Sequence, residues 1–158
     1  MNTPILAPTE RVLTITRVFD ASRDLVWKAW TDQEQAKHWW GPRHHPSTHV
    51  EIDARVGGKW RFVNKHPKGE AEFYGVYKVI DPPGRIVFTE IYAPFPDAES
   101  IVTAVFTEEN GKTRLTASCT YPSREVRDTV MKSGMEKGAA LSYDRLEEVA
   151  LELARIGA

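Results

Sequence analysis

The chain has 158 residues, of which 41% are hydrophobic and 27% are charged, and its formal net charge is −1. This length suits one domain that buries roughly two-thirds of its unfolded surface. The near-zero charge gives no electrostatic reason to expect nucleic acid or an anionic membrane as a partner. No apolar run approaches the roughly 20 residues that span a bilayer, and the N-terminus lacks the basic start and apolar core of an export signal. The single cysteine, Cys119, excludes an intramolecular disulfide and fits a reducing compartment, so we expect a cytoplasmic location.

The N-terminal segment predicts an arm followed by a strand. Residues 1–9 contain two prolines and an Asn-Thr pair, so we expect a flexible arm there. The β-branched run over residues 10–19 predicts the first strand. No internal repeat or linker follows, and we therefore expect a single domain over residues 10–156.

Two short helices are expected directly after this strand. Ser22 is placed to cap a helix that runs to Trp30. Thr31 and Glu34 have the spacing of a capping box, which predicts that a second short helix begins there.

The middle of the chain predicts an antiparallel meander of strands joined by turns. Asn110-Gly111 lies between two alternating runs and is the clearest hairpin signal, because both turn residues must accept a positive φ. Gly57-Gly58 is expected to form another turn. The predicted strands cover residues 48–54, 59–64, 70–80, 85–92, 101–107 and 113–121.

Two more helices are expected at the C-terminal end. Ser123 is placed to start a short helix, and the longest helical pattern follows over residues 134–156. One face of the longer helix carries an apolar stripe whose spacings alternate between four and three residues. The stripe consists of Met135, Ala139, Ser142, Leu146, Val149 and Leu153.

The predicted sheet is the only surface large enough to receive this stripe. The fold class is therefore α+β, with an antiparallel sheet wrapped around a long C-terminal helix and two short helices after the first strand. A twisted sheet seldom closes completely on one helix, so we expect an apolar cavity between them.

Alternation along the strands assigns side chains to the inner or outer face of the sheet. Trp60 and Phe62 are expected to face inward. In residues 70–80 one alternating set contains Tyr74 and the other contains Phe73 and Tyr77. Both sets are apolar enough for the interior, so the inner face of this strand is not assigned. The residues expected to line the cavity are Trp40, Trp60, Phe62, Tyr74, Phe106, Met135 and Ser142.

Residue types that carry catalytic or metal chemistry form no recognised pattern. The histidines His38, His44, His45 and His49 lie within twelve residues but lack a metal-ligand spacing, so we expect a solvated loop and no metal. The turn glycines do not have the spacing of a phosphate- or dinucleotide-binding loop, and we expect no cofactor. Cys119 has an inward pattern in mid-strand and is expected to be an inert buried thiol.

Five strings occur in chain order: RVFDASRDLVWKAWTD at 17–32, WWGP at 39–42, DARVGGKWRF at 53–62, GVYKVIDPPGRIV at 75–87 and GMEKGAALSYDRL at 134–146. Together they resemble the activator of Hsp90 ATPase homologue 1-like proteins, which belong to the START-like, or Bet v 1-like, superfamily. The resemblance implies a helix-grip fold and a hydrophobic cavity, which the superfamily uses for lipids, polyketides and other apolar molecules. It implies no shared catalytic residue set. In the co-chaperones of this kind Hsp90 stimulation also depends on a separate N-terminal domain, for which this chain has no room, so we do not expect an Hsp90 partner.

Our main hypothesis is binding of a small hydrophobic or amphipathic ligand in the cavity, without a cofactor. The first alternative is an enzyme of the cyclase or hydrolase type on the same fold. Its catalytic residues are not assigned, and the candidate acid–base groups are Tyr74, Tyr92, Asp53 and the His44-His45 pair.

The second alternative is a protein-interaction module that binds a chaperone through the outer face of the sheet. Tyr77 and Val79 are the residues expected to carry that interaction. An apolar outer strand is also compatible with a homodimer.

Overall fold

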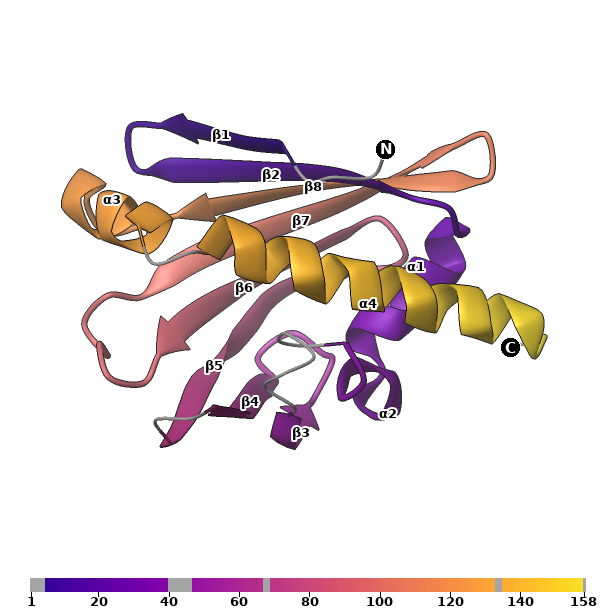
Figure 1. The fold of residues 1–158 in the computed structure, drawn as a ribbon, viewed down its shortest axis with the longest axis horizontal. Coiled ribbons are helices and arrows are strands. Elements are labelled where there is room, and N and C mark those ends of the chain that lie inside the picture. Colours follow the sequence, from indigo (N-terminus) through magenta and orange to yellow (C-terminus); the bar gives the residue numbers. More distant parts are fainter. Residues whose placement is uncertain (1–4, 40–46, 67–68, 133–134, 158) are drawn as a thin grey trace.

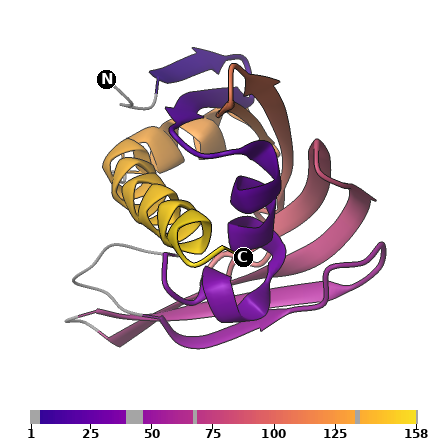
Figure 2. The ribbon, with the colours of Figure 1, turned by 90° about the vertical axis from the view of Figure 1, so that its right-hand side faces the viewer.

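The computed structural model describes residues 5–39, 47–66, 69–132 and 135–157. Within these residues eight strands form one sheet that curls around the last helix (Figures 1 and 2). The strands are β1 Ile5–Thr9, β2 Val12–Phe19, β3 Ser47–Ile52, β4 Lys59–His66, β5 Gly69–Asp81, β6 Arg85–Tyr92, β7 Ser100–Glu109 and β8 Lys112–Thr120. The helices are α1 Arg23–Thr31, α2 Gln33–Ala36, α3 Arg124–Lys132 and α4 Met135–Arg155.

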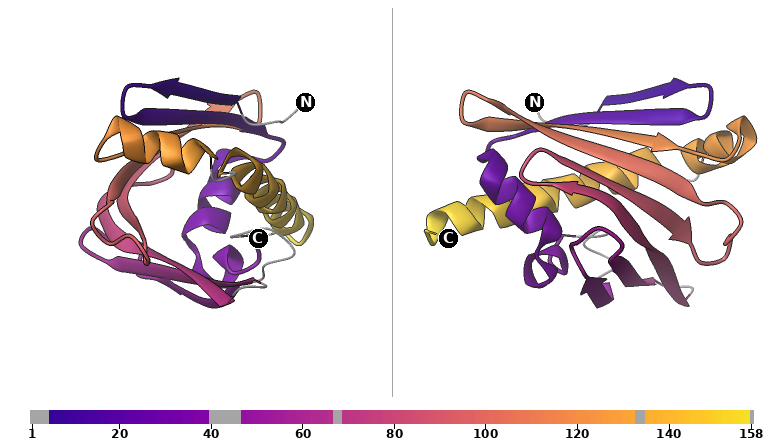
Figure 3. Two further views of the ribbon diagram at one scale, coloured as in Figure 1. Left: turned by 60° about the vertical axis from the view of Figure 1, so that its left-hand side comes forward. Right: turned by 180° about the vertical axis from the view of Figure 1, so that it is seen from behind.

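The strand order in the sheet is β1-β2-β8-β7-β6-β5-β4-β3, with antiparallel neighbours throughout the described strands. Strands β3 to β8 form a meander, and β2 joins its last strand although the two are far apart in sequence. Seen from behind, the sheet lies in front of α4, so the helix covers only its concave face (Figure 3). The predicted helix-grip architecture is confirmed.

The N-terminal segment differs from the prediction for residues 1–9. The structure has a strand over Ile5–Thr9, which pairs along its whole length with β2. The turn between β1 and β2 contains Glu10 at a φ of 43°. Pro8 is tolerated because β1 is an edge strand. On the outer side of this strand there is no neighbouring strand to accept the N–H that proline lacks. The arm predicted for this stretch was therefore wrong for residues 5–9.

The two short helices after β2 are confirmed, but the capping of the second was assigned to the wrong residue. The Thr31 hydroxyl donates to the carbonyl of Trp27 at 2.8 Å and so belongs to the last turn of α1. Asp32 caps α2 instead, because its carboxylate accepts the backbone N–H of Glu34 at 2.9 Å. At α3 the predicted cap is confirmed, since the Ser123 hydroxyl accepts the N–H of Val126 at 3.2 Å.

The predicted hairpin at Asn110-Gly111 connects β7 and β8, and both residues have a positive φ, 53° and 80°. Gly111 meets this requirement without strain, whereas any residue with a Cβ would be strained there.

The register of α4 is fixed by buried side chains and by one buried arginine. Tyr143, Leu146, Ala150 and Leu153 are all less than 9% exposed. The predicted stripe contained only the two leucines of this set, and its neighbours Ser142 and Val149 are half-buried.

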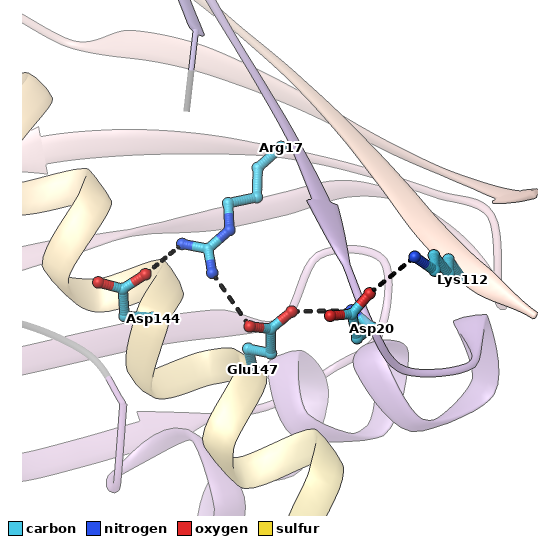
Figure 4. Close-up of polar contacts among 5 residues, drawn as sticks. All are labelled: Arg17, Asp20, Lys112, Asp144 and Glu147. Carbon is cyan, nitrogen blue, oxygen red and sulfur yellow. Dashed lines mark hydrogen bonds and ion pairs between the residues drawn. The ribbon is translucent and has the colours of Figure 1, made fainter. Parts of the chain in front are cut away.

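Arg17, which is 3% exposed on β2, joins α4 to the sheet (Figure 4). Its guanidinium lies 2.7 Å from the Asp144 carboxylate and 3.4 Å from the Glu147 carboxylate. Glu147 also accepts the backbone N–H of Asp20 at 2.7 Å, and the Asp20 carboxylate lies 3.2 Å from the Lys112 ammonium. This chain of contacts holds the middle of α4 against the end of β2.

Candidate functional site

The concave face of β4, β5 and β6 carries a continuous aromatic surface. Trp60 lies with its ring centroid 5.4 Å from Phe62 on the same strand and 5.5 Å from Phe88 on β6. Phe88 in turn lies 6.2 Å from Tyr77 on β5. These four side chains are all buried. We call Trp60, Phe62, Tyr77 and Phe88 the aromatic wall.

Trp60 is held in place by a close approach to the backbones of β5 and β6. Its indole N–H donates to the carbonyl of Thr89 at 3.1 Å, and its register partner on β5 is Gly75. A Cβ at Gly75 would lie 1.8 Å from the Thr89 carbonyl oxygen and 2.7 Å from the indole nitrogen. Only glycine therefore fits at this position, and its missing side chain leaves the indole room to lie there.

The structure assigns the faces of β5. Phe73 packs against the core and Tyr77 is 4% exposed, so this set faces inward. Tyr74 lies on the opposite face, where it lines a groove with Lys59 and Arg61. A β-bulge between Tyr77 and Val79 then changes the register.

The seven residues predicted to line the cavity are distributed over several places. Trp60 and Phe62 are in the aromatic wall. Tyr74 is on the convex face of the sheet. Ser142 is half-buried on α4. Trp40 and the side chain of Met135 lie outside the described residues.

Phe106 belongs to a different part of the interior. Its ring is 1% exposed and lies edge-on to Trp27 at 5.7 Å and to Trp30 at 5.4 Å. These contacts place it in the closed core under α1, so it acts as a packing residue.

Glu90 is an inward-facing acid that sequence reasoning missed. It alternates on β6 with Phe88, and Tyr92 follows two residues later on the same face, stacked on Phe73 at 5.0 Å. Glu90 is half-buried, and loss of solvation raises the pKa of its carboxyl to about 7. Its position in phase with two aromatic residues was the available sequence signal.

Three further polar side chains face the same space as Glu90. Burial, with a smaller contribution from the Glu90 charge, raises the pKa of the Cys119 thiol on β8 to about 12. Burial likewise raises the pKa values of Tyr121 and Tyr143, and the field of Glu90 contributes to both shifts. The Glu90 carboxyl group on β6 thus interacts electrostatically with Cys119 on β8 and with Tyr143 on α4, across the concave side of the sheet.

Two surface hollows lie outside this interior. A groove of about 440 Å³ runs over the convex face of β3 to β6, and the Arg61–Glu72 ion pair, 2.6 Å long, lies in it. A second hollow, of about 490 Å³, lies beside α2 and contains the ion pair between Asp53 and Arg55 at 2.9 Å. Both are open and are bordered by exposed charged residues.

The residues proposed for acid–base or metal chemistry do not converge in the described structure. Asp53 is exposed and pairs with Arg55, while Tyr74 is on the convex face. His49 pairs with Glu51 at 3.0 Å on the surface, and the His44-His45 pair lies outside the described residues. In the described residues no group of three histidine, cysteine or acidic side chains could hold a metal ion.

Among the helices of the described chain, none combines the length and apolarity needed to cross a bilayer.

The chain is similar to a known family and to several solved structures. The family model described as "Activator of Hsp90 ATPase homolog 1-like protein" matches residues 20–150. A crystal structure of a protein from Rhodobacter sphaeroides is 26% identical, with a TM-score of 0.86, and the alignment covers 95% of this chain and 99% of that one.

Two other structures are similar over comparable lengths. A solution structure of a protein from Arthrobacter aurescens has 25% identity, a TM-score of 0.84 and coverages of 94% and 91%. The crystal structure of protein Ms6760 from Mycobacterium smegmatis has 28% identity, a TM-score of 0.79 and coverages of 92% and 96%. A comparison with curated proteins gave no match.

Proposed function

Because the chain belongs to the family of activator of Hsp90 ATPase homolog 1-like proteins, we propose that it binds a small apolar or amphipathic ligand between the concave face of the sheet and α4. The observation that carries this proposal is incomplete burial on the concave face of β5 and β6. Phe73 and Glu90 are half-buried and Tyr92 is 38% exposed, although they continue the same face as the buried Phe88. A closed core would bury all four side chains.

The position of α4 supports the same proposal. Its backbone lies closest to α1 and α3, and Arg17 on β2 fixes its middle. The helix therefore packs on the β2 side of the interior (Figure 2). A ligand bound between the sheet and α4 would contact the partly exposed Phe73 and Tyr92, which lie on the same face as the aromatic wall. Stiff aromatic surface with a single polar group is typical of a site for a small, mostly apolar molecule.

The adjacent residues Phe73 and Tyr74 provide a matched test. Both are half-buried aromatic side chains on β5, but they lie on opposite faces of the sheet. A neutral fluorescent apolar probe, N-phenyl-1-naphthylamine, should bind wild-type protein, and Phe73→Ala should weaken its affinity by about tenfold because one aromatic contact is lost. Tyr74→Ala should leave the affinity unchanged.

Native mass spectrometry of protein purified without detergent adds an independent readout. A small molecule that is retained in the folded protein and released on unfolding would identify the ligand. Equal loss of probe affinity in Phe73→Ala and Tyr74→Ala, with both variants folded, would contradict binding at the concave face.

The family description names Hsp90 activation, but the residues expected to support an interaction module do not form one surface. Tyr77 is buried in the aromatic wall and cannot present its side chain on the outer face. That part of the interaction hypothesis was wrong. We therefore keep ligand binding as the proposed function.

A further inference from the structure

Glu90 places one acidic group within an otherwise apolar and aromatic surface. On one side of it along β6 is Phe88 of the aromatic wall, and on the other is Tyr92. In register on β7 is Ser100, whose hydroxyl donates to the backbone carbonyl of Glu90 at 3.2 Å. That serine is therefore occupied by the backbone, and its hydrogen bond leaves the Glu90 carboxyl group free.

No described side chain forms an ion pair or hydrogen bond with the Glu90 carboxyl group. Arg17 is the cation that faces the interior from β2, and Asp144 and Glu147 of α4 already bind it. The other polar groups that interact electrically with Glu90 are Cys119, Tyr121 and Tyr143. The concave face thus offers a negative or hydrogen-bonding group and no described cation to balance it.

A half-buried carboxylate without a counter-charge is costly, and a cation placed beside it recovers part of that cost. An anionic head group at the same place would add repulsion between like charges. Aromatic faces beside the carboxyl group also attract an ammonium ion. The electrostatics of this face therefore select for a positive head group.

We propose that the ligand is a cationic amphiphile, namely an alkyl- or aryl-substituted amine whose ammonium group binds the Glu90 carboxylate while its apolar part lies on the partly exposed Phe73 and Tyr92. This inference rests on the proposed function and deepens it, because it names the chemical class of the ligand and the residue that selects it. Glu90 acts as a binding and specificity residue for the head group.

The raised pKa of Glu90 gives the interaction a pH dependence. An aliphatic amine stays protonated well above neutral pH, whereas Glu90 loses its charge as the pH falls through about 7. Cys119, Tyr121 and Tyr143 have raised pKa values and stay neutral between pH 5.5 and 7.5. Amine affinity should therefore decrease toward low pH, while the affinity for a neutral ligand should not.

Three probes with one tail separate the contribution of the head group from that of the apolar part. Decylamine, decanol and decanoate are titrated calorimetrically, below their aggregation concentrations, into the full chain at pH 7.5. Decylamine should bind about tenfold to a hundredfold more tightly than decanol, as expected for a hydrogen bond to a charged group. Decanoate should bind more weakly than decanol.

The substitution Glu90→Gln should abolish the preference for the amine over decanol, because glutamine keeps the shape of the side chain without its charge. Glu108→Gln removes an equal charge from an exposed position on β7 and should leave all three affinities unchanged. The pH series needs no variant: in wild type, decylamine affinity should fall by about tenfold or more between pH 7.5 and 5.5.

Each outcome bears on one of the two proposals. If Glu90→Gln keeps the amine preference, or if wild type binds decanoate as tightly as decylamine, the inference on Glu90 is overturned while ligand binding stands. If wild type binds none of the three probes, and N-phenyl-1-naphthylamine also fails to bind, the proposed function and this inference both fall.

Discussion

Glu90→Gln should also change how the stability of the protein depends on pH, independently of any ligand. The pKa of Glu90 rises from its ordinary value of 4.5 to about 7 because folding removes water from its carboxyl group. Between these two values the folded protein holds a proton that the unfolded chain releases. The free energy of unfolding of wild type therefore carries a penalty from Glu90 that is nearly absent below pH 4.5, grows as the pH rises to 7 and is constant above it.

The size of this penalty follows from the same pKa values. A pKa change of one corresponds to about 1.4 kcal/mol, so the full difference is worth roughly 3 kcal/mol at pH 8. Because Glu90 is half-buried, solvent reduces this figure, and about 1–2 kcal/mol is the expected range. Glutamine is neutral at every pH and carries no such penalty. The stabilisation of the protein by Glu90→Gln should therefore be about 1–2 kcal/mol larger at pH 8 than at pH 5.

Urea unfolding followed by tryptophan fluorescence measures this difference. Wild type, Glu90→Gln and the exposed control Glu108→Gln are each unfolded at pH 5 and pH 8, and the free energies are extrapolated to water. All other titrating groups are common to the three proteins, so their contributions cancel in the comparison. If the stability difference between Glu90→Gln and wild type is equal at the two pH values, within about 0.5 kcal/mol, the reasoning on Glu90 is refuted.

Four substitutions elsewhere test the packing that positions the site. Gly75→Ala should destabilise the protein by more than about 3 kcal/mol in thermal or urea unfolding, because its Cβ would overlap a carbonyl oxygen at 1.8 Å; a loss below about 1 kcal/mol would contradict that overlap. Gly111→Ala should cost only about 1 kcal/mol, since the position needs a φ of 80° but has open space around it; aggregation or full unfolding would be inconsistent with this. Removal of the Glu147 carboxylate, which is 17% exposed, should cost about 2–3 kcal/mol, and removal of the Asp144 carboxylate, which is 64% exposed, less than about 1 kcal/mol. In a double-mutant cycle with Arg17, a larger cost for the loss of Asp144 than for the loss of Glu147 would show that the shorter contact, at 2.7 Å, dominates.

The sequence predicted the sheet and the helices where local chemistry and alternation agree. The last hairpin was predictable from Asn110-Gly111, because few residue pairs tolerate two positive φ values. Trp60 and Phe62 alternate with the charged Lys59 and Arg61, so their inward orientation was readable from alternation. Strand β1 was missed because two prolines in residues 1–9 lower the strand propensity of this stretch, although an edge strand tolerates Pro8.

The candidate site was less predictable, for two physical reasons. In β5 both faces are apolar, and the bulge after Tyr77 shifts the phase, so that Ile80 again packs on the core. Composition alone could not separate Phe73 from Tyr74. Glu90 was missed because a charged residue in a strand is normally placed on the solvent side, and only its phase with Phe88 argued otherwise.

The reactivity of the Cys119 thiol can report how often the interior of the protein opens. Its thiol is the single one in the chain, it faces the concave side, and both burial and a pKa near 12 suppress its reaction at neutral pH. A thiol reagent can modify it only as often as the interior opens, so the labelling rate of the unmodified protein reports the frequency of opening. A molecule that occupies the interior lowers this rate in proportion to its occupancy. The natural sequence thus carries a one-site reporter of opening that requires no added label position and whose modified form is distinguished by mass.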